Sequence, residues 1–468
     1  MDNTLQKNHP LDKMDRELIH VVTAVCLAFL TAVVYNWLVE NTGASPAARF
    51  LALINASLFA ALGMRFIPIW VASWKKTAVV GEEDIIVEAP EKAEKKSVYA
   101  KVFFSLLMID ILIVIFIYFL QILSGKGGPF KEALKLWEAT DSGHYLAIAR
   151  DWYLSAGHRD RLVQLVFLPG YPLLIRVVNI FVGNYLYSGM IASGLCFAGA
   201  GTMFYRLVRL DHSYEYAVRA LTYLCILPGA FFFAAPMSES LFLLLSVSCI
   251  YFLRRKNWLI ACLLAGWASF TRSLGLTLLA PILFEMIADD RKISADKTDK
   301  SKFKYFNIVF ILLGFGAYLL VNYQVSGNPF QFLVYQKEHW SQSLGLFFNT
   351  VSYQTDYAIK TFQEQNYHSL LGLWLPNLFS IFFSLIVMLA AVKKIRPSYT
   401  AWFFAYYIIA IGATWLLSAP RYLLVLFPTT LALASLTDKR WLDRIITITC
   451  IIFYIIYAYM FVNRWQVW

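Results

Sequence analysis

Apolar runs of membrane length follow one another along almost the whole chain, and short polar segments separate them. A helix needs roughly 20 apolar residues to cross about 30 Å of hydrocarbon. The pattern therefore predicts an all-α polytopic membrane protein with about 13 transmembrane helices. The predicted spans are about 20–39, 50–72, 101–123, 186–207, 216–235, 239–254, 258–272, 273–288, 304–324, 373–393, 399–417, 421–437 and 443–462.

One apolar run does not fit a regular span. Residues 165–183 are apolar, but Pro169, Gly170 and Pro172 interrupt them, and proline breaks a spanning helix. We expect a helix that lies at the membrane interface or re-enters the membrane. A full crossing here would reverse the orientation of every later span, and the basic residues that flank those spans argue against it.

Clusters of Lys and Arg lie in the loops that follow alternate spans. Because basic residues favour the cytoplasmic side, these loops and the N-terminus are predicted to be cytoplasmic and the C-terminus to lie outside. The two largest outer loops are then 124–185 and 325–372. The chain divides into an N-terminal pair of transmembrane helices (1–74), a charged cytoplasmic linker (75–100) and a main membrane domain (101–468).

Composition agrees with the membrane class. Hydrophobic residues make up 59% of the chain and charged residues 15%, against about 45–50% and about 25% in globular chains. The net charge of +11 follows from the basic cytoplasmic loops, so it does not indicate a nucleic acid partner. The six cysteines lie in apolar stretches without a CxxC pair, which predicts neither a disulfide framework nor a zinc site.

The first outer loop contains an unusual polar segment, WEATDSGHYLAIARDWY at 137–153. Glu138, Asp141, His144 and Asp151 crowd together there at the edge of the membrane. Ionisable groups at such a place indicate a polar site. The simpler interpretation is a solvated amphipathic helix.

Other polar residues also fall at the outer ends of spans. Glu239 begins a span, and Arg272 and Arg421 each lie at the end of an apolar helix. Arginine can hold a phosphate with two parallel hydrogen bonds, and a carboxylate such as Asp141 can take a proton from an attacking hydroxyl. The aromatic outer loop 327–340 suits a sugar ring. The combination favours transfer of a group from a lipid phosphate.

Five blocks of the chain, taken in order, carry a resemblance to a known family. They are DSGHYLAIARDWY (141–153) with FLPGYPLLIR (167–176), PGAFFFAAPMSESLFLLL (228–245), SFTRSLGL (269–276), GNPFQFLVYQKEHW (327–340) and SAPRYLLVLFP (418–428). These blocks resemble the signature of PIG-V-type mannosyltransferases, which include the enzyme that adds the second mannose of GPI anchors and have bacterial relatives. The resemblance covers about 125–430.

The resemblance implies a GT-C-type fold and an inverting glycosyltransferase that uses a polyprenyl-phosphate sugar donor. Asp141 takes the acidic position of the first outer loop and would be the general base. Glu239 would orient the acceptor or assist the base. Arg272 and Arg421 match two arginines of the family and would hold the donor phosphate.

The same resemblance implies the groups that contact substrate. Gln336 and Trp340 would line the sugar site, and His144 and Tyr145 would contact substrate beside Asp141. The expected partners are the sugar donor, a glycolipid or envelope glycan acceptor, and the lipid bilayer. Mannose follows from the resemblance alone, since nothing in the spacing distinguishes it from glucose or galactose.

The chain departs from the family pattern at three places. Thr140 stands where the family has Trp, Trp152-Tyr153 replaces a Gly-Tyr, and Ser238 replaces a Thr. These changes keep the carboxylate but put the identity of the sugar or acceptor in doubt.

Each site residue also has a purely structural interpretation. Asp141 could cap the helix that begins at Ser142, and Glu239 suits the first turn of a helix. Arg272 and Arg421 could extend toward lipid headgroups. For the whole chain the alternatives are a transporter or flippase of lipid-linked sugars, and an acyl or phospholipid transferase of the envelope.

No cofactor is indicated, and no metal ligands are predicted, although a divalent metal stays open because GT-C members differ. We expect a bacterial cytoplasmic membrane with the active site facing outward, or the endoplasmic reticulum membrane if the protein is eukaryotic.

Overall fold

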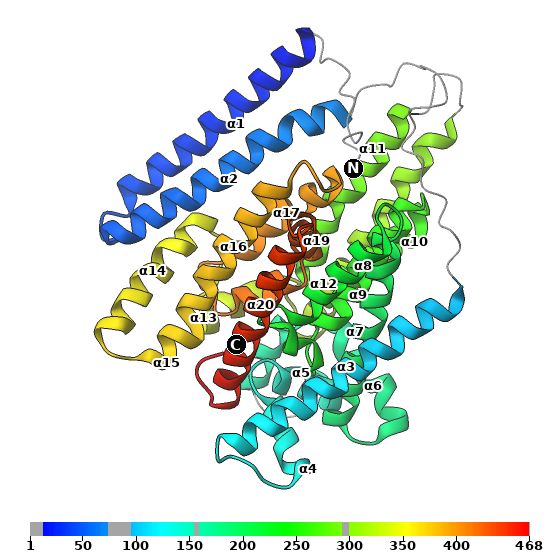
Figure 1. The fold of residues 1–468 in the computed structure, drawn as a ribbon, viewed down its shortest axis with the longest axis vertical. Helices are drawn as coiled ribbons and strands as arrows, with labels where there is room; N and C mark the ends of the chain where they lie inside the picture. Colours follow the sequence, from blue (N-terminus) through cyan, green and yellow to red (C-terminus); the bar gives the residue numbers. More distant parts are fainter. Residues whose placement is uncertain (1–12, 74–94, 154–158, 293–298, 468) are drawn as a thin grey trace.

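The computed structural model describes residues 13–73, 95–153, 159–292 and 299–467, and its architecture is helical (Figure 1). The first half contains α1 (Lys13–Glu40), α2 (Pro46–Ser73), α3 (Lys96–Leu123), α4 (Phe130–Ala133), α5 (Ser142–Asp151), α6 (Gly170–Val182), α7 (Tyr185–Val208), α8 (Tyr214–Ile226), α9 (Glu239–Arg254) and α10 (Trp258–Thr271). The second half contains α11 (Leu279–Lys292), α12 (Val309–Ser326), α13 (Gln331–Trp340), α14 (Phe347–Gln363), α15 (Tyr367–Ser369), α16 (Leu375–Ala391), α17 (Pro397–Ile411), α18 (Ala419–Leu424), α19 (Phe427–Leu436) and α20 (Arg440–Val462). An isolated bridge joins Leu344 to Ala413.

Seven helices in the described residues are long and apolar enough to cross a membrane, which confirms the predicted class of an all-α polytopic membrane protein. They are α1, α2, α3, α7, the helix Phe303–Ser326 that includes α12, the helix Tyr367–Ala391 that includes α16, and α20. α6, α10 and α19 are shorter apolar helices. Large apolar side chains such as Phe29, Phe104 and Ile445 are exposed on these helices, as expected of surfaces that face lipid.

The centre of the molecule is the pair α7 and α9. α9 occupies the predicted span 239–254 and is buried along almost its whole length. It packs against α7 and α10, while α3 covers α7 and α12 covers α10. The α10–α12 contact is very close, because a Cβ added at Gly314 would lie 1.9 Å from the backbone oxygen of Gly266. Small residues permit this approach of two backbones.

Two predicted spans are broken near prolines. In the predicted span 216–235, α8 ends at Ile226 before Pro228, and a short 3-10 helix (Ala230–Ala234) follows. In the predicted span 421–437, α18 ends at Leu424 and α19 begins at Phe427. Proline removes a donor and clashes with the preceding turn, so these segments leave the helical path. Broken helices within a membrane protein are tolerated where they are buried in protein or line a cavity.

The two ends of α9 carry opposite charges. Glu239 lies in its first turn, and Arg254 in its last turn donates two hydrogen bonds of 2.6 and 2.7 Å to the carboxylate of Asp211. Acid at the N-terminus and base at the C-terminus both suit the helix dipole. The helix that crosses the core is therefore held by ion pairs at each end.

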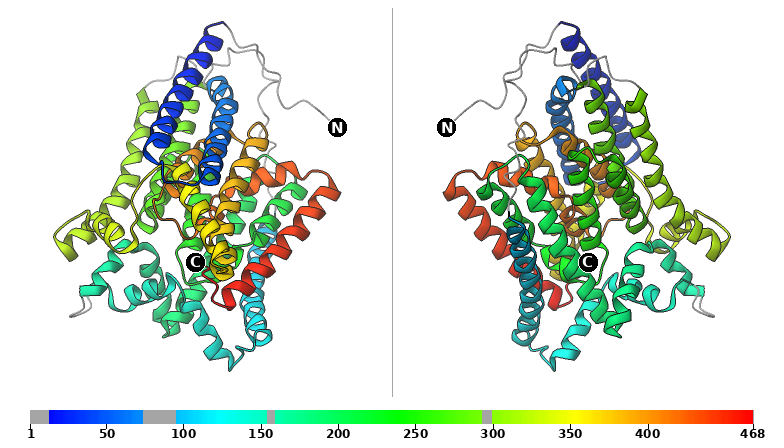
Figure 2. Two further views of the ribbon diagram at one scale, coloured as in Figure 1. Left: turned by 90° about the vertical axis from the view of Figure 1, so that its left-hand side faces the viewer. Right: turned by 90° about the vertical axis from the view of Figure 1, so that its right-hand side faces the viewer.

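The N-terminal pair lies along one side of the bundle, and the start of α1 and the short helix α4 lie at opposite ends of the molecule (Figure 1, Figure 2). α2 packs against α14, α16 and α17. Within this contact the amide of buried Asn55 donates to the Tyr407 hydroxyl at 3.0 Å. Residues 75–94 of the predicted linker 75–100 lie outside the described residues, and α3 begins at Lys96.

Candidate active site

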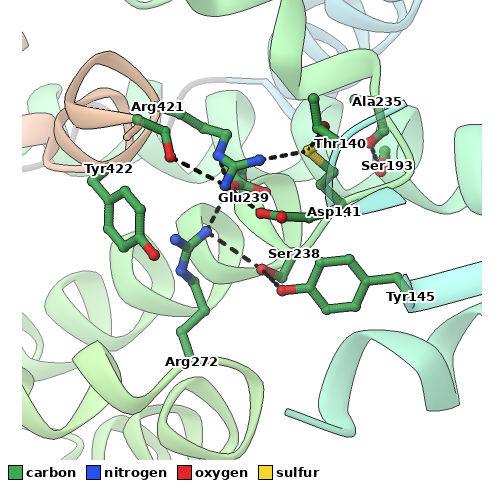
Figure 3. Close-up of polar contacts among 12 residues, drawn as sticks. Thr140, Asp141, Tyr145, Ser193, Ala235, Ser238, Glu239, Arg272, Arg421 and Tyr422 are labelled. Atoms are coloured by element: carbon green, nitrogen blue, oxygen red, sulfur yellow. Dashed lines mark hydrogen bonds and ion pairs between the residues drawn. The ribbon is translucent and has the colours of Figure 1, made fainter. Parts of the chain in front are cut away.

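Four charged residues from separate parts of the chain meet in one cluster (Figure 3). Asp141 stands just before α5, Glu239 begins α9, Arg272 follows α10, and Arg421 lies in α18. All four were predicted as site residues, and the structure brings them into direct contact.

Asp141 pairs with Arg421. Although Asp141 stands at the N-cap position of α5, its side chain makes no capping hydrogen bond; instead Arg421 Nη2 donates to Asp141 Oδ2. The preceding residue, Thr140, has a φ of 58°, an uncommon conformation for a β-branched residue. Such strained backbone clusters at functional sites, and here it turns the chain immediately before the carboxylate.

Glu239 lies between the two arginines. Its Oε1 accepts a 2.6 Å hydrogen bond from Arg272 Nη1 and lies 3.1 Å from Arg421 Nε. The residue is only 2% exposed. Its Oε2 is buried and has no hydrogen-bond partner among the described residues. Buried charges require partners, and Glu239 is the counter-charge shared by both guanidinium groups.

Arg272 is surrounded by fixed partners. Besides Glu239, its Nη1 lies 3.3 Å from Ser238 Oγ, and Ser238 Oγ is 2.9 Å from the Tyr145 hydroxyl. The guanidinium carbon lies 4.8 Å from the centre of the Tyr422 ring, a cation–π geometry. Arg272 is therefore held on several sides.

Arg421 has weaker contacts on its other nitrogen. Its Nη1 has the sulfur of Met237 as partner at 3.1 Å, and thioether sulfur is a weak acceptor. Its Nη2 also lies 3.4 Å from Ser418 Oγ. Neither arginine extends outward to lipid headgroups, since Arg272 is 8% exposed and Arg421 is 3% exposed.

The buried loop between α8 and α9 supports this cluster. Phe231, Phe232 and Phe233 are fully buried and anchor the loop in the core. Ser240 donates to the Phe233 carbonyl and Ser193 to the Ala235 carbonyl, both at 2.7 Å. These bonds satisfy backbone groups that no helix provides for, so the irregular segment can present Ser238 and Glu239 inside the protein.

Several aromatic side chains lie beside the charged cluster and contact one another. His144 stacks on Phe167 with ring centres 4.6 Å apart, and Phe167 contacts both Tyr145 and Trp340 edge-on. Burial lowers the pKa of His144 more than nearby Asp141 raises it. The structure thus connects three predicted substrate-binding residues, His144, Tyr145 and Trp340, through Phe167.

Gln336, the remaining predicted substrate-binding residue, is linked through Gln342 to the segment before α18. Its amide donates to the Gln342 side chain at 3.3 Å, and Gln342 donates to the carbonyl of Trp415 at 3.0 Å. Further along, Asn377 accepts from the Ala419 backbone N–H at 2.9 Å and so fixes the start of α18. Gln336 is therefore connected to the segment that leads to Arg421.

Metal ligands do not gather in the described part of the chain, where no group of three or more His, Cys, Asp or Glu side chains could hold an ion. The two acids of the cluster have arginine partners instead. The arrangement suits an anionic ligand and a proton-accepting carboxylate.

A solved protein structure is similar to much of this chain. No family model matches the chain, and no curated protein matches it. The crystal structure of ArnT from Cupriavidus metallidurans bound to undecaprenyl phosphate is similar to 71% of this chain and 74% of that chain, at 12% identity and a TM-score of 0.42. Membership of a PIG-V-type family stays a prediction from the sequence.

Three contact residues of the site, Met237, Tyr422 and Phe167, were not predicted from the sequence. Each lies within a quoted block, and Met237 and Tyr422 are chain neighbours of Ser238 and Arg421. Their positions next to predicted site residues could have indicated that Met237 and Tyr422 lie at the site. The role of Phe167 depends on how α5 meets the segment before α6, which no local pattern specifies.

Proposed function

We propose that this protein is a GT-C-type glycosyltransferase. It moves a sugar, mannose by the resemblance of its sequence blocks, from a polyprenyl-phosphate donor to a hydroxyl of a lipid-linked or envelope acceptor at the outer face of the membrane. The observation that carries the proposal is the Asp141–Arg421 pair beside the buried Glu239–Arg272 pair. A carboxylate that accepts protons and a guanidinium that binds phosphate are adjacent.

The reaction would be a single inverting displacement. Asp141 takes the proton of the acceptor hydroxyl, whose oxygen attacks the anomeric carbon. The bond from that carbon to the phosphate oxygen breaks, and its electron pair leaves with the phosphate, which Arg421 stabilises. Asp141 suits the base role because its side chain is 32% exposed, so an acceptor can reach it.

The other residues would position these groups. Glu239 and Arg272 hold Arg421 and Ser238 in place. His144, Tyr145 and Trp340 form the aromatic side of the site, where sugar rings would pack, and Gln336 would reach the sugar site through the α13 loop. A multi-pass protein of the cytoplasmic membrane, or of the endoplasmic reticulum membrane in a eukaryote, gives a lipid-linked donor direct access.

Sugar transfer by the purified, detergent-solubilised protein tests this function. Labelled polyprenyl-phosphate mannose is the donor, and a membrane extract that contains a competent acceptor supplies the hydroxyl. We expect transfer by the wild type and a loss of about 10²–10⁴-fold in Asp141→Asn. Asp151→Asn is the matched control, because Asp151 lies at the other end of α5 in an exposed pair with Arg150.

The outcomes separate the parts of the proposal. Equal activity of wild type and Asp141→Asn would remove Asp141 as the base. Transfer with another sugar but not with mannose would keep the mechanism and change the donor. No transfer with any polyprenyl donor would contradict the glycosyltransferase and favour a transporter of lipid-linked sugars.

A further inference from the structure

We propose that Arg421 alternates between Asp141 and the donor phosphate, so that binding of the donor releases the base. The inference rests on the proposed function and adds an order of events to it. While Arg421 is paired with Asp141, this carboxylate is not free to act as the base; the lipid phosphate takes the place of Asp141 on the guanidinium.

Arg421 is the arginine of the cluster that can change partners. Arg272 is fixed by Glu239 at 2.6 Å, by Ser238 and by the Tyr422 ring. Arg421 instead divides one edge of its guanidinium between different acceptors, with Nη1 on the Met237 sulfur and Nη2 on Asp141. Its other contacts are long, 3.4 Å from Nη2 to Ser418 Oγ and 5.9 Å from the guanidinium carbon to the centre of the Phe232 ring. Its Nε lies 3.1 Å from Glu239 Oε1, although it makes no hydrogen bond among the described residues.

A phosphate is a better partner for that edge than the present pair. Two parallel N–H groups of a guanidinium match two oxygens of a phosphate, and such charge-assisted bonds are roughly twice as strong as neutral ones. Taking both Nη1 and Nη2 would replace a weak sulfur contact with a strong one. The cost of the exchange is the loss of the Asp141 contact.

The balance of charge decides which acid is released. Two carboxylates match two guanidinium groups in the cluster, so an added phosphodiester leaves one carboxylate without a partner. Glu239 is 2% exposed and touches both arginines, so its isolation would be costly. The Asp141 side chain is 32% exposed and can be hydrated after it leaves.

Carboxylate labelling tests the exchange without relying on turnover. The full-length protein in detergent is treated with a water-soluble carbodiimide and an amine, with and without polyprenyl monophosphate that carries no sugar, and each site is quantified by mass spectrometry. We expect labelling of Asp141 to rise several-fold with the lipid. Labelling of Asp151 should stay the same, since its partner Arg150 lies outside the cluster.

Distinct results overturn the inference and the proposed function. If the lipid binds, as measured by its retention on the protein, but Asp141 labelling is unchanged or falls, the exchange is wrong and the glycosyltransferase stands. If polyprenyl monophosphate does not bind at all, the proposed donor class fails, and the exchange fails with it.

Discussion

At the scale of single residues, the two carboxylates of the site differ most in burial. Glu239 is enclosed with two guanidinium partners, whereas about a third of the Asp141 side chain is open to solvent. Removing one partner of a buried ion pair costs about 3–5 kcal/mol, because the other charge is left uncompensated. Arg421, the buried partner of Asp141, also lies 3.1 Å from Glu239, so it keeps a counter-charge when Asp141 is removed. Glu239 therefore supports the structure of the site, and Asp141 is free to serve its chemistry.

This difference in burial predicts that two conservative substitutions lower the free energy of unfolding by different amounts. We expect Glu239→Gln to lower the free energy of unfolding by about 3–5 kcal/mol and Asp141→Asn to lower it by less, because Arg421 keeps Glu239 as a counter-charge in that variant. Unfolding of both variants in the same detergent, followed by intrinsic fluorescence, measures the difference. An equal or larger loss in Asp141→Asn would contradict the assignment.

His144 predicts a pH dependence of stability. Burial lowers the pKa of His144 in the folded chain, so the unfolded chain, with a pKa near about 6.5, binds the proton more readily. The stability that the neutral ring contributes is complete above about pH 6.5 and is lost as the pH falls toward the lower folded pKa.

The measurement is the melting temperature of wild type and His144→Gln at mildly alkaline and mildly acidic pH. We expect acidification to lower the melting temperature of the wild type more than that of the variant. Burial also lowers the pKa of His212, but both proteins contain that residue, so its effect cancels. If the difference in melting temperature between wild type and His144→Gln is the same at both pH values, the prediction is wrong.

The sequence located the charged residues of the site but not their pairing. Asp141 and Arg421 are 280 residues apart. Asp141 was recognised in the polar segment of the first outer loop, and Arg421 separately at the end of an apolar helix. Which acid meets which arginine depends on how α5, α9 and α18 pack, and no local pattern contains that information. The sulfur of Met237 beside Arg421 was unpredictable for the same reason.

At the scale of elements, the site lies where helices break. The long apolar runs predicted α7 and α9 closely, because hydrophobic length alone defines a regular span. The breaks within 216–235 and 421–437 were missed, because a hydropathy pattern does not show which side chains will satisfy freed backbone groups. Ser193 and Ser240 do so between α8 and α9. The buried loop that presents Glu239 depends on them.

The close crossing of α10 and α12 gives a prediction at this scale. Gly314→Ala places a methyl group against the backbone of Gly266, and overpacking of this kind typically costs about 1–3 kcal/mol. Gly316→Ala, two residues further along the same helix, meets nothing within 4 Å. We expect a lower melting temperature for the first variant and an unchanged or slightly higher one for the control, since alanine favours helix. Equal melting temperatures would mean that the two helices separate without cost.

At the scale of the whole molecule, the N-terminal pair is packed against the later helices. The Phe59 ring of α2 contacts the rings of Phe347, Phe404 and Tyr407, with centres 4.5, 5.1 and 6.0 Å apart. Such aromatic contacts add about 0.5–1.5 kcal/mol each beyond area burial. The charged linker in the sequence indicated that the pair is separate from the other spans. The hydropathy pattern contains no information on which helices the pair contacts.

Truncation tests the contribution of the pair. Deletion of residues 1–74 removes α1 and α2 and uncovers these rings, so we expect a clearly lower melting temperature and more aggregation in detergent. Deletion of residues 1–12 is the control, because it leaves every contact of α1 and α2 described above. Full stability of the longer deletion would show that the pair is separable from the bundle.

The equal numbers of acids and arginines in the site have a consequence for how a donor arrives. Opposite charges this close cancel at a distance, so the cluster projects little field toward an approaching anion, and electrostatic steering contributes little to capture. Encounter then depends on diffusion of the lipid within the bilayer plane, and selection begins only on contact. A donor capture rate that hardly changes between low and high ionic strength is the expected signature, in contrast to anion sites that carry a net positive charge.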